Sequence, residues 1–180
     1  SSVYSLNLAQ NQNKFLDSRI AALVKNNKKK ENNDDNKILF FRQPKFPFLI
    51  SKDIKDFIQS LDPTNSIAHI HMINIPQFYL LVRKLRKRNI KYIISPHGGF
   101  SLNSLRRSRI KKYIFKIFFQ NYINKNSEKI IAFSSEEKKY FIRYGINKNN
   151  IELIPNGFFF KDKFDKPEPN KENVLSVIYI

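Results

Sequence analysis

The sequence predicts an α/β fold built on a doubly wound parallel sheet. From residue 20 onward, short apolar runs rich in β-branched residues alternate with longer segments of helical periodicity. This alternation is typical of βαβ units, whose right-handed crossovers place helices on both faces of a sheet. The run Lys91–Ser95 (KYIIS) leads straight into the turn sequence PHGG at 96–99. Because proline ends ladder pairing and parallel sheets bind ligands at their carboxyl edge, this stretch is the expected centre of a binding site.

In the first half of the chain, strands and helices follow from the spacing of apolar residues. Short β-branched or aromatic runs predict strands at Ile20–Val24 (IAALV), Ile38–Phe41 (ILFF) and Ile67–Ile73 (IAHIHMI). Apolar residues at the helical period predict helices at Ser51–Leu61 and Pro76–Asn89, and a short helix at Val3–Phe15 with Ser1 or Ser2 as its N-cap. The polar run at 25–37 predicts a solvated loop.

In the second half, strands are expected at Lys91–Ser95, Lys129–Phe133 and Ile151–Ile154. A long helix, Ser104–Asn124, joins the first two of them. Another helix follows Phe133, with Ser134 or Ser135 as its N-cap and Gly145 just past its end. Glu136 and Glu137 in its first turn suit the positive end of the helix dipole.

Polar residues follow several of these strands, at the edge where their carboxyl ends would meet. They are Asn74, His97, Gly98, Gly99, Ser134, Ser135, Glu136 and Asn156. The imidazole of His97, beside two glycines, can contact a bound ligand, and a structural histidine in a glycine turn is the equally weighted alternative.

His69 and His71 alternate on one expected strand, so both side chains point to the same face. A catalytic zinc ion needs three protein ligands, and no third ligand accompanies the pair in its segment. We therefore interpret both residues as structural or ligand-lining, with no metal site.

The formal net charge is +18, and the window from Arg83 to Lys116 holds twelve Lys or Arg residues and no acid. Such a surface faces anions: phospholipid headgroups, a phosphorylated ligand or nucleic acid. On the long helix, the expected core stripe is Ile110, Tyr113, Ile114, Ile117 and Phe118, with Phe115 and Phe119 beside it. A membrane contact is then expected from Arg106, Arg107, Arg109, Lys111, Lys112, Phe115, Lys116 and Phe119. The alternative is that the two phenylalanines pack under a neighbouring helix or loop.

The expected organisation is one domain at 1–160, a charged, proline-containing linker at 161–173, and the first strand of a second domain at 174–180. No apolar stretch approaches the roughly 20 residues that span a bilayer. The sequence has no cysteine, which leaves out disulfides and thiolate metal sites.

Several motifs in order make the chain resemble the family 4 glycosyltransferases. They are HIHMI at 69–73, YIISPHGGF at 92–100, the basic helix RRSRIKK at 106–112, KIIAFSSEEKKYF at 129–141, RYG at 143–145 and IELIPNGF at 151–158. The chain is similar to the N-terminal domain of their two-domain GT-B architecture, by motif over 67–158 and by element order over 1–66.

The resemblance implies two Rossmann-like domains with an active site between them. The N-terminal domain would hold the acceptor and the C-terminal domain the nucleotide-sugar donor, and transfer would retain configuration without a metal or other cofactor. His97 matches the residue that faces the reacting sugar, with Gly98 and Gly99 in its turn. Ser134, Ser135 and Glu136 match the family's strand-to-helix turn, and Asn156 and Gly157 match the crossing into the second domain. The family's first strand with its glycine loop, and its donor domain, are then missing from residues 1–180.

The expected function is a retaining glycosyltransferase that extends a lipid-linked or polysaccharide acceptor in cell-surface glycan biosynthesis, such as lipopolysaccharide or capsule. We expect it at the cytoplasmic face of the inner membrane, on an anionic lipid surface and without nucleic acid, and we expect residues 1–180 alone to be inactive. The alternative is a non-enzymatic basic domain that binds nucleic acid or an anionic membrane. The aromatic residues lie in apolar stripes and are not interleaved with arginine, which argues against nucleic acid.

Overall fold

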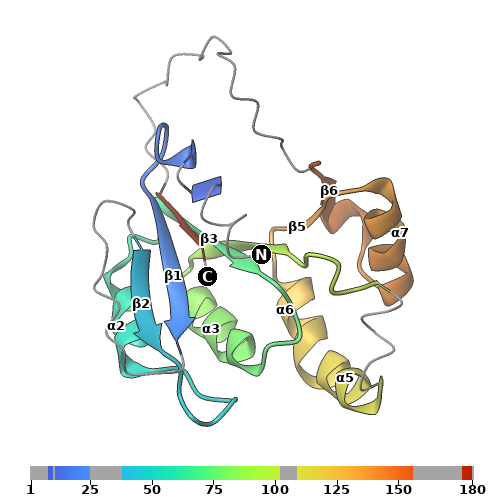
Figure 1. Ribbon diagram of the computed structural model, residues 1–180, viewed down its shortest axis with the longest axis horizontal. Helices are drawn as coiled ribbons and strands as arrows, with labels where there is room; N and C mark the ends of the chain where they lie inside the picture. Colours follow the sequence, from blue (N-terminus) through green and yellow to red (C-terminus); the bar gives the residue numbers. More distant parts are fainter. Residues whose placement is uncertain (1–7, 10, 25–37, 102–108, 156–175, 180) are drawn as a thin grey trace.

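The computed structural model describes residues 8–9, 11–24, 38–101, 109–155 and 176–179. In this part of the chain, one parallel sheet has the strand order β2-β1-β7-β3-β4-β5-β6 (Figure 1). The strands are β1 (Ser18–Val24), β2 (Ile38–Arg42), β3 (Ser66–His71), β4 (Lys91–Ser95), β5 (Lys129–Ala132), β6 (Ile151–Leu153) and β7 (Ser176–Tyr179).

The described helices are α2 (Lys52–Ser60), α3 (Pro76–Lys87), α5 (Arg109–Phe115), α6 (Asn121–Lys125) and α7 (Ser135–Tyr144). A π-helical turn, η2 (Lys116–Gln120), joins α5 to α6, and a 3-10 turn, η3 (Lys148–Asn150), precedes β6. Strands β1 and β2 extend to one edge of the sheet, and β3 to β6 extend to the other. This reversal of strand order confirms the predicted doubly wound α/β fold.

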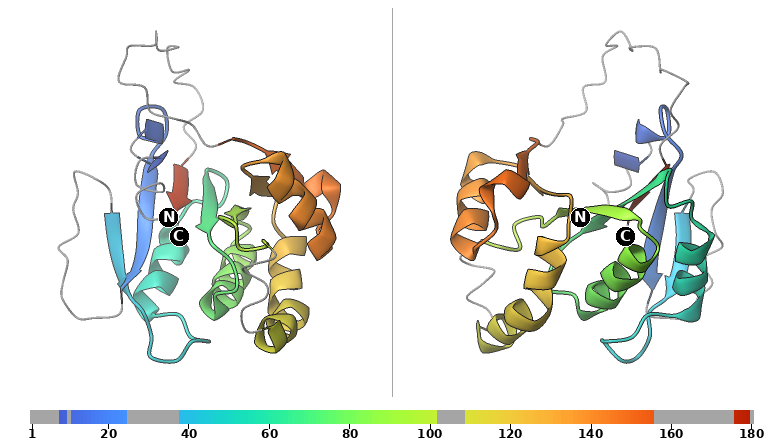
Figure 2. Two further views of the ribbon diagram at one scale, coloured as in Figure 1. Left: turned by 45° about the vertical axis from the view of Figure 1, so that its right-hand side comes forward. Right: turned by 180° about the vertical axis from the view of Figure 1, so that it is seen from behind.

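A large buried cluster holds the helices against the sheet. Alternate strand residues, such as Ala68 and Ile70 of β3, enter this cluster together with side chains of α2, α3, α6 and α7. Ile67 lies between them in sequence and contacts a smaller cluster around Ala9, on the other face. Figure 2 shows α2, α3 and α6 on the same side of the sheet. Helices were expected on both faces. Among the described residues, the helical turn around Ala9 packs on the second face.

Serine side chains cap two of the described helices, and the caps of α7 confirm the prediction. The Ser51 hydroxyl accepts a hydrogen bond from the backbone N–H of Ile54, and α2 buries Ile54 and Ile58. Of the two serines proposed for α7, Ser134 is the N-cap: its Oγ accepts from the backbone N–H of Glu137 at 3.1 Å. Gly145 ends that helix with a left-handed φ of 99°.

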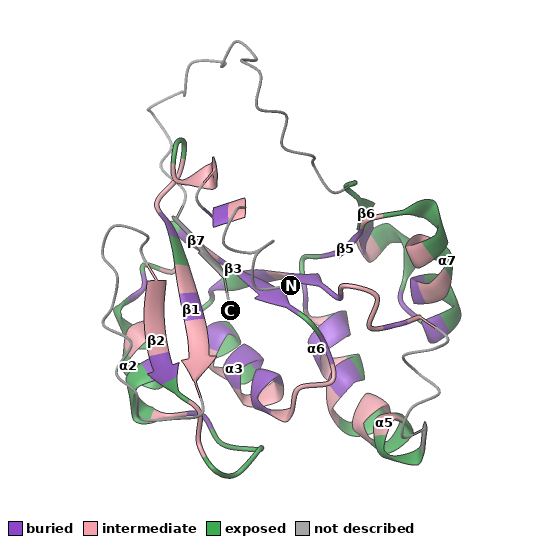
Figure 3. Ribbon diagram, viewed as in Figure 1, coloured by how far each residue is buried: buried purple, intermediate pink, exposed green. Residues whose placement is uncertain are grey.

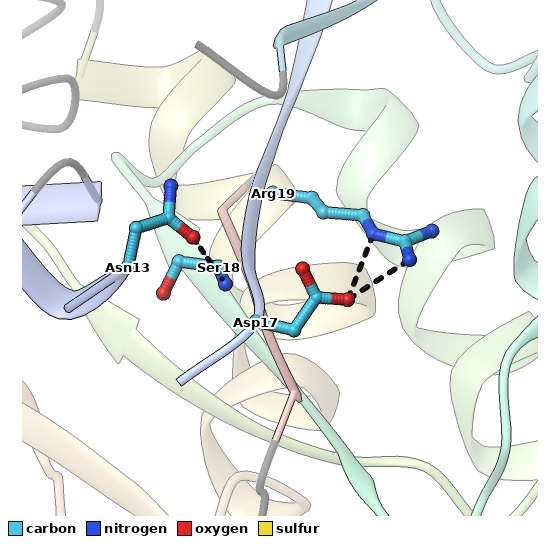
Figure 4. Close-up of polar contacts among 4 residues, drawn as sticks. All are labelled: Asn13, Asp17, Ser18 and Arg19. Atoms are coloured by element: carbon cyan, nitrogen blue, oxygen red, sulfur yellow. Dashed lines mark hydrogen bonds and ion pairs between the residues drawn. The ribbon is translucent and has the colours of Figure 1, made fainter. Parts of the chain in front are cut away.

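Polar contacts fix the point at which β1 begins (Figure 4). The backbone N–H of Ser18 donates to Asn13 Oδ1 at 2.8 Å, and the Arg19 guanidinium contacts Asp17 Oδ2 at 2.9 and 3.2 Å. Ser18 is fully buried and pairs with Val177 of β7. The turn before β1 therefore sets where the strand enters the sheet.

The terminal strand differs from its prediction. Residues 174–180 were expected to start a second domain, but Ser176–Tyr179 forms β7 in the same sheet, between β1 and β3. A parallel strand in this position pairs with the backbone N–H and C=O groups of both neighbours. Without it, these groups would lack hydrogen-bond partners within the sheet. The β-branched Val177 and Ile178 suit such a central strand.

The long helix has its buried and exposed faces reversed from the prediction. Ile110, Tyr113, Ile114, Ile117 and Phe118 were expected in the core, and all five are exposed. Phe119 is instead half-buried, with its ring centroid 5.0 Å from that of Tyr79 on α3 and 5.3 Å from that of Phe48 in the β2–α2 loop. Packing of Phe119 under a neighbouring helix and loop, left open by the sequence, is thus the arrangement observed.

Some sequence predictions lie outside the described residues. They are the N-cap at Ser1 or Ser2, the loop at 25–37, the start of the long helix at 104–108 and the linker at 161–173. Strand β3 ends two residues before its predicted end, because Met72 takes a φ of 80°. In the described part of the chain, no helix is long and apolar enough to cross a bilayer.

Candidate functional site

The carboxyl ends of β3 and β4 bring the three histidines of the chain together. The rings of His69 and His71 have centroids 4.2 Å apart, and His71 stacks on His97 at 5.1 Å. Nδ1 of His71 lies 2.8 Å from Nε2 of His97, so one of these nitrogens donates to the other. On the neighbouring strand, Ser95 Oγ lies 2.7 Å from Nε2 of His69. The result is one connected imidazole cluster beside the point where strand order reverses.

Left-handed backbone conformations surround this cluster. Met72 and Asn74 after β3 have φ angles of 80° and 60°, and His97 and Gly98 after β4 have φ angles of 49° and 73°. Non-glycine residues rarely adopt this region, and such residues gather at binding and catalytic sites. The two turns therefore hold their side chains in defined positions at the sheet edge.

Close packing joins the two turns. A Cβ atom placed on Gly99 would lie 2.5 Å from Cγ1 of Ile73, so any other residue there would have to displace the Ile73 side chain. The backbone N–H of Gly99 also donates to the carbonyl of Pro96 at 3.1 Å. Gly98 thus takes a positive φ, and Gly99 packs closely against Ile73.

Glu137 fixes the histidine turn from the neighbouring helix. Its Oε1 accepts a hydrogen bond from the backbone N–H of Gly98 at 2.9 Å, and its Oε2 accepts one from Phe133 at 2.8 Å. The ring of Phe133 also lies 5.1 Å from that of His97. A single carboxylate thus connects the end of β5 to the turn that carries His97.

Asn74 is held by a chain of buried amides. Its backbone N–H donates to Gln120 Oε1 at 3.1 Å, and Gln120 Nε2 donates to Asn124 Oδ1 at 2.8 Å. Gln120 is buried in the π-helical turn η2, a kind of distortion frequent at functional sites. The side-chain Oδ1 of Asn74 is buried and has no hydrogen-bond partner among the described residues. It is a natural acceptor for a ligand hydroxyl.

Burial keeps the histidine cluster neutral at physiological pH. Desolvation lowers the pKa of His69 to about 3 and the pKa of His71 even further, and it also lowers the pKa of the half-buried His97. The neighbouring imidazoles act in the same direction, since each disfavours a positive charge on the others. The Glu137 carboxylate opposes this shift at His97. Neutral imidazoles can both donate to and accept from sugar or water hydroxyls.

The other predicted site residues lie at the start of α7 or outside the described residues. Ser134 is engaged in capping α7, Ser135 is exposed, and Glu136 accepts a hydrogen bond from the hydroxyl of Tyr140 on its own helix. Asn156 and Gly157 lie outside the described residues, as do Arg106 and Arg107.

The remaining residues expected at a membrane lie on the α5–η2 helix. For Arg109, only the backbone is described. Lys111 is exposed, and Lys112, Phe115 and Phe119 are half-buried. Lys116 turns away from the exposed stripe, because its Nζ donates to the carbonyl of Tyr144 at 2.7 Å and lies 4.2 Å from the centre of that ring.

Sequence reasoning missed Glu137, Gln120 and Ser95 as parts of the site, and it did not connect the histidine pair to His97. The signal for Glu137 was the spacing Ser134-x-x-Glu137, which places this glutamate three residues after the N-cap. No local pattern marks Gln120, whose partner lies 46 residues away.

The arrangement suits a polyhydroxylated ligand. Neutral imidazoles, a buried amide oxygen and a glycine turn converge on one edge of the sheet, where ligands of doubly wound folds bind. Among the described residues, no group of three or more His, Cys, Asp or Glu side chains could hold a metal ion.

The comparison with protein families gives a match. The family described as Glycosyltransferase Family 4 matches residues 4–158, which is most of the chain. No curated protein and no solved structure matches the chain.

Proposed function

Since the chain belongs to glycosyltransferase family 4, as an N-terminal domain of the GT-B type, we propose that it forms the acceptor side of a retaining glycosyltransferase. The enzyme transfers a sugar from a nucleotide-sugar donor to a lipid-linked or polysaccharide glycan. This reaction belongs to the synthesis of a cell-surface glycan, lipopolysaccharide or capsule, at the cytoplasmic face of the inner membrane. Transfer needs no metal ion or other cofactor.

The observation that carries this proposal is the fixed turn of His97. Its left-handed backbone and the hydrogen bond from Gly98 to Glu137 hold the imidazole at the carboxyl edge of the sheet. In the proposed complex, His97 faces the reacting sugar. Asn74 Oδ1, buried and without a partner among the described residues, accepts a hydroxyl hydrogen of the acceptor.

The chemistry of transfer explains why such fixed polar groups matter. In the transition state, positive charge develops on the sugar while negative charge develops on the departing diphosphate. Polar groups held in place before the reaction stabilise this separation, because they need no reorganisation as charge develops. A neutral imidazole at the sugar is better suited than a cation, which would oppose the positive charge there. The burial that lowers the histidine pKa values supports this role.

The test is acceptor binding and sugar transfer in variants of His97. We expect His97→Ala and His97→Asn to lower transfer by on the order of 10²-fold to 10³-fold, the usual loss when one preorganised polar group is removed. Asparagine tolerates the left-handed conformation at this position, so His97→Asn keeps the turn while removing the imidazole. Lys139→Ala is the control, because Lys139 is exposed on α7. Full transfer by a folded His97→Asn variant would assign His97 a structural role only.

A second experiment tests whether donor binding belongs to a separate domain. We expect residues 1–180 to bind a glycan acceptor, seen by ligand-observed NMR, and to transfer no sugar by themselves. Detectable transfer by this chain alone would overturn the assignment of donor binding to a separate domain.

A further inference from the structure

The solvent-facing side of the α5–η2 helix is apolar. Ile110, Ile114 and Ile117 lie three or four residues apart and form one stripe with Tyr113 and Phe118. All five are exposed, and Phe118 is exposed to 64%. A helix on the surface of a soluble domain normally has polar residues on its solvent-facing side. The apolar stripe is therefore a candidate for contact with an apolar partner.

A second exposed apolar segment lies next to this helix. The β2–α2 loop exposes Phe46 (70%), Phe48 and Leu49. Phe119 connects the two segments, because its ring centroid lies 5.3 Å from that of Phe48 and 6.4 Å from that of Phe118. We call the six exposed residues Phe46, Phe48, Leu49, Ile114, Ile117 and Phe118 the apolar rim.

The apolar rim projects from the side of the molecule that carries the candidate site. In Figures 1 and 2, the β2–α2 loop and α5 extend beyond the sheet at the end toward which β1 and β2 point. Figure 3 shows much of this loop and of α5 as exposed. A flat partner that touches both segments would therefore lie close to the carboxyl edge of the sheet.

The charges around the apolar rim indicate the nature of this partner. Residues 36–52 contain no acid, and Arg42 and Lys45 beside the loop segment are exposed. Residues 83–116 also contain no acid, and Lys111 is exposed beside the helical segment. Exposed aromatic and aliphatic side chains flanked by cations match the boundary between the headgroups and acyl chains of an anionic bilayer.

We propose that the apolar rim inserts into an anionic lipid bilayer, with Arg42, Lys45 and Lys111 at the headgroups. This surface replaces the membrane contact expected from Phe115 and Phe119, which lie on the inner side of the helix. The proposal rests on the membrane location proposed above and names the surface that makes the contact. Vesicle binding is measured without donor or acceptor, so it fails or holds independently of catalysis.

The chain has no tryptophan, which permits a direct test of insertion. Phe118→Trp and Ile142→Trp each introduce a single reporter at an exposed apolar position, the second on α7 and away from the apolar rim. On vesicles of phosphatidylcholine and phosphatidylglycerol, we expect the emission of Phe118→Trp to shift to shorter wavelength and to be quenched by brominated lipid. The emission of Ile142→Trp should remain that of a water-exposed indole.

Sedimentation with the same vesicles measures affinity. Binding should rise with the proportion of phosphatidylglycerol and fall with salt, because screening weakens the cation contacts. The pair Ile117→Ser and Phe118→Ser should weaken binding by about tenfold or more, since each loses a buried apolar side chain in the bound state. Ile142→Ser with Ile154→Ser is the matched apolar control, and Lys111→Glu is compared with Lys139→Glu on α7.

Three outcomes would overturn the proposal. Equal shifts of both tryptophan reporters would show that insertion does not occur at the apolar rim. Equal and weak binding of neutral and anionic vesicles at low salt would show that the cations are only solvated. A dimer in light scattering that the Ile117→Ser, Phe118→Ser pair dissociates, without any vesicle binding, would make the apolar rim an interface between copies of this chain.

Discussion

Acid should destabilise this fold through its histidine cluster, with a magnitude that follows from the structure. The pKa of His69 falls from an ordinary value of 6.5 to about 3, and the pKa of His71 lies lower still. Below pH 6.5 the unfolded chain therefore binds protons that the folded chain does not, so the free energy of unfolding decreases as pH falls. This loss continues down to about pH 3, where His69 begins to titrate in the folded state.

Each of these two histidines contributes about 1.4 kcal/mol per pH unit below its unfolded pKa. At pH 5, which is 1.5 units below the ordinary value of 6.5, the pair should lower the free energy of unfolding by about 4 kcal/mol relative to pH 7.5. That loss is a large part of the roughly 5–15 kcal/mol that stabilises a domain of ordinary size.

The assay is urea unfolding at a series of pH values from 7.5 to 5. The chain suits this assay because all three of its histidines belong to the cluster. No imidazole outside the cluster therefore titrates between pH 7.5 and 5. A variant with His69→Gln and His71→Gln should start less stable at pH 7.5 and lose much less stability at pH 5. NMR of the imidazole protons should show two rings that do not titrate above about pH 4. An unfolding free energy that stays within about 1 kcal/mol between pH 7.5 and 5 would refute a neutral, buried cluster.

Two further predictions concern the turn that carries His97. Glu137→Gln should lower the free energy of unfolding by about 1.5–3 kcal/mol, because one of two charge-assisted hydrogen bonds to backbone N–H groups is lost. Glu136→Gln, which affects only an exposed contact on α7, should change it by less than about 0.5 kcal/mol in the same urea experiment, and equal effects would contradict the structure. Gly99→Ala should cost about 1–3 kcal/mol through its clash with Ile73. In a double-mutant cycle with Ile73→Ala, the combined loss should be smaller than the sum of the single losses, and strict additivity would mean that the clash is relieved elsewhere.

Much of the fold follows from local sequence. Strand β4 has the bounds that its apolar run and the following proline predict, and α2 begins after the serine that caps it. These features depend on backbone dihedral limits and on hydrogen bonds within a few residues, so sequence spacing is enough to find them. The position of His97 at the sheet edge follows from the same local rules, combined with the shared direction of parallel strands.

Part of the candidate site could not be found in this way. The hydrogen bond between His71 and His97 joins residues 26 positions apart, and the one between Asn74 and Gln120 joins residues 46 apart. The choice between the adjacent Glu136 and Glu137 depends on how α7 is rotated against β4 and β5. Only Glu137 reaches the backbone N–H groups of Gly98 and Phe133.

The sequence by itself determined the alternation of strands and helices, the caps, and the glycine turn after β4, because each depends on neighbouring residues. Only the tertiary structure decided which stripe of the α5–η2 helix is buried and where β7 pairs. Both stripes of that helix are apolar, so its periodicity has two solutions, and the contacts of Phe119 with Tyr79 and Phe48 select one. The run at 176–179 has the β-branched composition of a buried strand, and the open backbone groups of β1 and β3 decide its place in the sheet.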